Sequence, residues 1–146
     1  MSHGTFYRYF HNKDELFGLL LRQTVVTLAE LAGEFPVTDA PADLRRWLEH
    51  WFDAFAEHGA LFSAWKDADM ADPFVAGHEH EVAGPVVMAL RARLARRGFG
   101  DADADAVALI ALVQRMPSVS LLGGLDRDQV ITLAHDLVQR AFVAAR

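Results

Sequence analysis

The polar cluster His78-Glu79-His80-Glu81 is the part of the sequence most suggestive of chemistry, because imidazole and carboxylate groups are common zinc ligands. On a helix, His78 and His80 lie about 200° apart and cannot chelate one ion together, whereas His78 shares a face with Glu81 or Val82. A metal site would therefore need ligands from elsewhere in the chain. We expect a solvated helix surface and no metal, with a His78 that faces a ligand pocket as the alternative.

The sequence contains no motif that indicates catalysis. The chain has no cysteine, which excludes thiol catalysis, a disulfide framework and cysteine-ligated zinc. A nucleophile elbow, a phosphate-binding loop and a His-Glu-x-x-His zinc motif are all missing. We expect a protein that is not an enzyme and needs no cofactor, and the lack of cysteine suits a cytoplasmic location.

The segment from Ser2 to Leu16 combines small, aromatic and charged residues in a dense order: Ser-x-Gly-Thr, then aromatic-Tyr-x-aromatic-Phe, then Asn-Lys-Asp-Glu-Leu. It closely resembles the recognition helix and following turn of the TetR family of transcriptional regulators. About a dozen defined positions match, which makes the signal far more specific than a short loop motif. A plain aromatic cap on a helix bundle is the alternative interpretation.

The resemblance implies a set of DNA contacts. Tyr7 and Lys13 would bind phosphate, which suits a phenol hydroxyl and a cation at the start of a helix. Ser2 would cap the recognition helix, whose first turn enters the major groove. The base-reading face would then hold His3, Gly4, Thr5 and Tyr9.

Family members carry two further helices before the recognition helix, and here the motif starts at Ser2, directly after Met1. We therefore expect an N-terminally truncated member with an incomplete helix-turn-helix. Residues 1–16 would be the remnant of the DNA-binding domain and residues 17–146 a helical ligand-binding and dimerisation domain. A misplaced start codon, a deliberately shortened chain and a natural truncation remain open.

Nearly every segment has helical periodicity, which predicts an all-α fold. Asn12 should cap a helix that runs to about Gly33, and Pro41 should open the next, which Gly59 should close. A shorter helix would come next, and Gly84-Pro85 should kink or split a helix over 74–97 that Gly98 ends. The next helix should span about 103–122. The last helix should begin after Asp126, where Gln129 would complete a capping box.

Aromatic and thioether side chains are abundant between residues 47 and 116. In the TetR family the helix after the DNA-binding motif links it to further helices, which enclose an inducer pocket. Pocket walls of aromatic and thioether side chains would fit an apolar or planar ligand. A filled core is the alternative for each residue. The candidate ligand-binding residues are Trp47, Trp51, Phe55, Phe62, Trp65, Met70, Phe74, His78, Met88 and Met116.

Each of the last two predicted helices has two apolar faces. In a monomer one face of each would be exposed, so a homodimer contact is the simplest way to cover them. The candidate interface residues are Leu109, Leu112, Val113, Val130, Leu133, Leu137 and Ala141. The apolar stretch 106–125 contains Gln114 and Arg115, which favours a buried helix over a membrane span.

The net charge of −6 is unevenly distributed. Residues 1–23 carry three basic and two acidic side chains, and the other 123 residues carry 11 basic and 18 acidic ones. An acidic body repels phosphate, so DNA contact should come from the N-terminal end. We expect a ligand-responsive repressor that binds operator DNA as a homodimer and is released by a small apolar or aromatic effector. A ligand-binding and dimerisation module without DNA affinity is the alternative.

Overall fold

The computed structural model describes residues 13–67 and 73–143, with side chains described outside 13–14, 17, 60–83 and 120–122. Within these ranges the chain forms helices and no strand, so the predicted all-α class is confirmed. The helices are α2 (Lys13–Gly33), α3 (Pro41–Asp67), α4 (Pro73–Arg96), α5 (Ala102–Gly123), α6 (Arg127–Val138) and the short π-helix η1 (Gln139–Val143).

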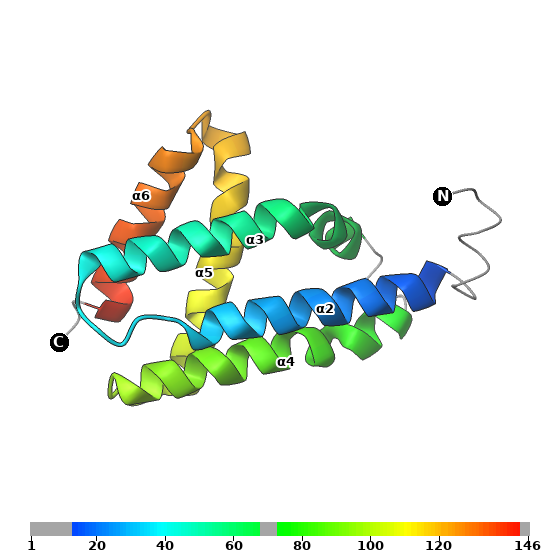
Figure 1. Ribbon diagram of the computed structural model, residues 1–146, viewed down its shortest axis with the longest axis horizontal. Coiled ribbons are helices and arrows are strands. Elements are labelled where there is room, and N and C mark those ends of the chain that lie inside the picture. The colour runs from blue at the N-terminus through cyan, green and yellow to red at the C-terminus, as the bar shows by residue number, and fades with distance from the viewer. Residues whose placement is uncertain (1–12, 68–72, 144–146) are drawn as a thin grey trace.

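The helices form two connected groups. In the first, α2 lies alongside α4 and also packs against α3. In the second, α5 runs steeply across the other helices and α6 returns beside it (Figure 1). Contacts of α5 with α4 and of α6 with α3 join the two groups, so both groups contribute side chains to the core.

Several helix ends lie where the sequence predicts them. Pro41 opens α3, and the Asp126–Gln129 capping box is complete, with a 2.9 Å bond in each direction. Gly98 closes α4 with φ of 79°, and the next amide, that of Phe99, bonds the carbonyl of Leu94. This is a Schellman motif, which needs a residue that tolerates the left-handed conformation.

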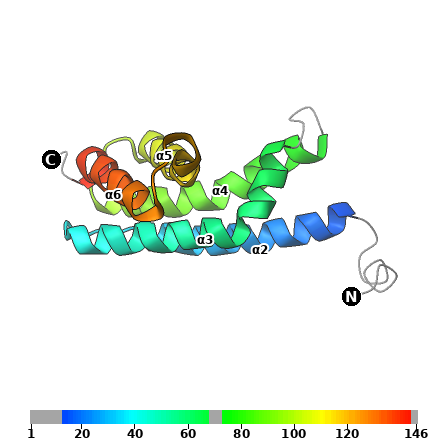
Figure 2. The same cartoon turned by 90° about the horizontal axis from the view of Figure 1, so that it is seen from above.

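One predicted helix end is wrong, and one predicted interruption is wrong in part. Gly59 does not close its helix: its φ is not left-handed, and α3 continues to Asp67. An interior glycine costs a helix only about 1 kcal/mol, so the apolar periodicity beyond it prevails. The last turns of α3 instead bend away from its earlier axis (Figure 2). Of the kink or split predicted at Gly84-Pro85, only the split is excluded, because α4 is one helix with Pro85 inside it.

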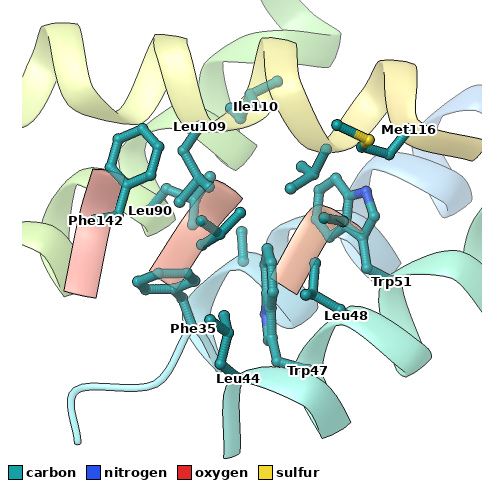
Figure 3. Close-up of a cluster of buried hydrophobic side chains, with 14 of the residues drawn as sticks. Phe35, Leu44, Trp47, Leu48, Trp51, Leu90, Leu109, Ile110, Met116 and Phe142 are labelled. Atoms are coloured by element: carbon teal, nitrogen blue, oxygen red, sulfur yellow. The ribbon is translucent and has the colours of Figure 1, made fainter. Parts of the chain in front are cut away.

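The core lies where the two groups meet. Leu48, Leu90 and Leu109 are completely buried and come from three different helices (Figure 3), and Val113 of α5 is also completely buried. The α2–α3 connection adds Phe35, which is also completely buried. Among the described residues, no helix is long and apolar enough to cross a membrane.

Candidate functional site

A row of aromatic rings runs from the α2–α3 connection along α3. Phe35 meets Trp47 edge-on with ring centroids 5.0 Å apart, Trp47 lies 5.3 Å from Trp51, and Trp51 lies 5.6 Å from Phe55. A spacing of four residues puts the α3 members on one face of the helix. Trp47 and Trp51 are buried, and Phe55 is half-buried.

The two indole N–H groups in this row differ. Trp47 Nε1 donates to the carbonyl of Leu31 on α2 at 2.6 Å. Trp51 Nε1 is buried and has no hydrogen-bond partner among the described residues, and Figure 3 shows it on the side of the ring toward Met116. Buried donors are almost always paired, so Trp51 is an exception within the core.

The predicted ligand-binding residues fall into three groups. Trp47, Trp51 and Met116 are buried in the core, and Phe55 is half-buried against it. Met88 is 68% exposed, so its assignment to an enclosed pocket is wrong: it lies on the solvent side of α4. The others lie outside the described residues or side chains: Phe62, Trp65, Met70, Phe74 and His78.

The structure does not describe the side chain of any predicted DNA-binding residue. Lys13 is the first residue of α2, but its side chain is not described. The predicted domain boundary after residue 16 falls inside α2. Lying wholly outside the described residues are His3, Gly4, Thr5, Tyr7 and Tyr9.

The predicted dimer residues divide between core and surface. Leu109, Val113 and Val130 are at most 1% exposed within a single chain, so their assignment to an interface is corrected. They face α3 and α4, the partners that the sequence alone did not supply. Leu112 is partly buried. Exposed along α6 and η1 are Leu133, Leu137 and Ala141, one helical turn apart.

Two arginines at the end of α4 hold the α2–α3 connection. Arg97 donates to the carbonyls of Pro36 at 3.2 Å and Thr38 at 2.8 Å, and pairs with Asp39. Arg93, one turn earlier, donates through Nε to the carbonyl of Phe35 at 2.7 Å.

The pattern in α4 could have revealed this role. Arg93 and Arg97 share the face of Leu90 and Leu94, both fully buried, so four positions form one inward stripe. Arg91 lies on another face and pairs with Asp103 of α5 at 3.0 Å. Arg97 and Arg93 therefore bind the α2–α3 connection, whereas Arg91 binds α5.

A surface groove of about 270 Å³ opens beside this connection. Its walls come from three segments: the α2–α3 connection, the first turns of α3 and one residue of α4. The lining residues are Glu34, Pro36, Val37, Thr38, Asp43, Arg46, Trp47, His50 and Arg93. Trp47 is thus the one predicted ligand-binding residue that borders this groove.

The described residues contain no group of three or more side chains able to hold a metal ion. Comparison with protein-family models, curated proteins and solved structures gave no match. The functional assignment therefore depends on the sequence motif and on the surfaces described above.

Proposed function

We propose that this protein is a ligand-responsive transcriptional regulator of the TetR type, acting as a repressor. It binds operator DNA as a homodimer and is released by a small effector. The Ser2–Leu16 motif is the single observation that carries this proposal, because its order of residues matches a DNA-reading helix at about a dozen positions.

The position of α2 supports a link between the motif and the core. The last four motif residues, Lys13 to Leu16, form the first turn of α2, and the same helix places Leu28 and Ala32 in the core. A ligand that shifts the packing of α2 against α4 would move whatever precedes Lys13. Such a shared helix is the element through which ligand and DNA binding would be coupled.

The surface of α5 and α6 supports the dimer. Leu133 and Leu137 are 38% and 37% exposed, and Val107 of α5 is 56% exposed. The two helices pack against each other. A second copy would bury these side chains by an isologous contact.

The buried aromatic row supports an apolar or aromatic effector. Trp51 Nε1 lacks a partner in the described core, and an effector with a hydrogen-bond acceptor would supply one. A ligand in contact with Trp51 would also press on Trp47, which is bonded to α2. Displacement of α2 would then release the operator.

Selection from a random duplex DNA library tests the proposal. The protein should enrich an inverted repeat, and two copies should bind each duplex. Affinity should fall steeply with salt, because phosphate contacts release counterions. Failure to enrich any sequence at low salt would refute DNA binding.

The charge distribution favours a second candidate, a ligand-binding and dimerisation module without DNA affinity. Residues 24–146 carry 11 basic and 18 acidic side chains, which oppose phosphate binding by the helical body. Specific operator binding by the 146-residue chain in a gel shift would refute the module.

A further inference from the structure

The feature that the proposed regulator leaves unexplained is the charge of Arg93. The residue is half-buried, and its only hydrogen bond among the described residues is the one from Nε to Phe35. Nη1 and Nη2 have no partner there, and no described carboxylate pairs with this side chain. A partly buried cation without an anion is unfavourable, because desolvation is not offset by a counter-charge.

Arg97 shows what a compensated arginine looks like on the same face. Its side chain is only 6% exposed, and its charge meets the Asp39 carboxylate as well as two carbonyls. Arg93 has the same orientation on the helix but faces the groove instead of an acidic partner. The missing counter-charge is therefore located at the groove.

The rest of the groove fits a small anion with an apolar body. Trp47, Pro36 and Val37 give it an apolar wall, and Arg46 adds a second cation, although Asp43 already lies 3.7 Å from it. The volume of about 270 Å³ lies just under the roughly 300 Å³ at the lower end of typical ligand sites, so the ligand must be small.

The two acidic wall residues do not fill the role of counter-charge. Asp43 already accepts a 2.7 Å hydrogen bond from Thr38 and lies 3.7 Å from Arg46. Glu34 is exposed, so solvent screens its repulsion of an anion.

We propose that the groove between the α2–α3 connection and α4 is a binding site for a small organic carboxylate. The carboxylate accepts hydrogen bonds from the Nη groups of Arg93, in the two-pronged geometry that guanidinium groups favour. Arg46 adds charge, and the ligand's apolar part rests against Trp47 and Val37. The site does not depend on DNA binding, and of the buried aromatic row it uses only Trp47, so it stands apart from the proposed repressor function.

Benzoate is the probe, added to the ¹⁵N-labelled chain at low ionic strength and followed by NMR. Saturable shifts should appear at the Arg93 Nε–H and at the amides of Thr38 and His50. Benzamide, which has nearly the same shape without the charge, should bind at least tenfold more weakly. No saturable shift with benzoate, or equal binding of benzamide, would overturn the proposal.

Four variants locate the site. Arg93→Gln should lower benzoate affinity at least tenfold. Arg46→Gln should lower it about threefold, and because the Arg46 side chain is exposed, this change should leave the fold intact. Arg91→Gln, on the same helix but away from the groove, is the matched control and should bind like wild type. Glu34→Gln should tighten benzoate binding, since it removes a repelling charge. Undiminished binding by both groove arginine variants, or weaker binding by Glu34→Gln, would show that the groove does not hold the carboxylate.

Discussion

Trp47 and Trp51 lie one turn apart on α3 with ring centroids 5.3 Å apart, yet only Trp47 has a partner for its indole N–H among the described residues. Both rings are almost completely buried, so loss of either ring costs similar apolar area. The pair therefore isolates the contribution of one hydrogen bond between α3 and α2.

Trp47→Phe should destabilise the fold more than Trp51→Phe, by about 1 kcal/mol, the typical net value of a buried hydrogen bond. Both changes remove the same atoms, which makes each the control for the other. Urea unfolding followed by circular dichroism measures the difference. An equal or larger loss for Trp51→Phe would contradict the assignment of the Leu31 bond as a stabilising contact.

Arg97→Met should lower the free energy of unfolding by about 2 kcal/mol, since it leaves two carbonyls and Asp39 without their cationic donor. Arg96→Met, on the neighbouring exposed residue, should change it by less than about 0.5 kcal/mol. Thermal unfolding of both variants measures the contrast. Equal melting temperatures for the two would show that Arg97 does not hold the connection.

Asp126→Ala should cost about 1 kcal/mol, because the side chain that accepts from the amide of Gln129 is lost at the start of α6. Asp126→Asn should cost far less, as asparagine caps a helix about as well. Guanidinium unfolding compares them. A full loss in the asparagine variant would point to charge rather than capping.

Leu137→Glu should convert the proposed dimer to monomer, since it places a charge in the exposed apolar stripe of α6. Val26→Glu, on an exposed apolar residue of α2, is the matched control and should remain dimeric. Sedimentation equilibrium gives both masses. A monomeric wild type, or a dimeric Leu137→Glu, would argue against this interface.

Local signals predicted much of the fold. The Pro41 start, the Asp126–Gln129 box and the Gly98 cap depend on neighbouring residues alone, and all three are present. Gly59 misled the prediction, because a glycine closes a helix only where the packing of the next residues favours a left-handed φ over another helical turn.

The candidate site was harder to predict, because it depends on contacts between distant segments. Periodicity identified the apolar faces of α5 and α6 but not which face the chain itself would cover, and so Leu109 and Val130 were assigned to the wrong partner. The bond of Arg93 to Phe35 joins residues 58 apart in sequence, and no local pattern specifies such a pairing. Its inward position was visible in the spacing to Leu90, but its acceptor was not.

The salt dependence of operator binding tests the central claim most directly. On a duplex selected from random DNA, fluorescence anisotropy should show affinity falling with salt, and Lys13→Ala should weaken binding and reduce the slope by about one. Tyr7→Phe, which loses only a hydroxyl, should weaken binding with little change of slope. Unchanged affinity and slope in Lys13→Ala, or the absence of any selected duplex, would contradict the regulator that we propose.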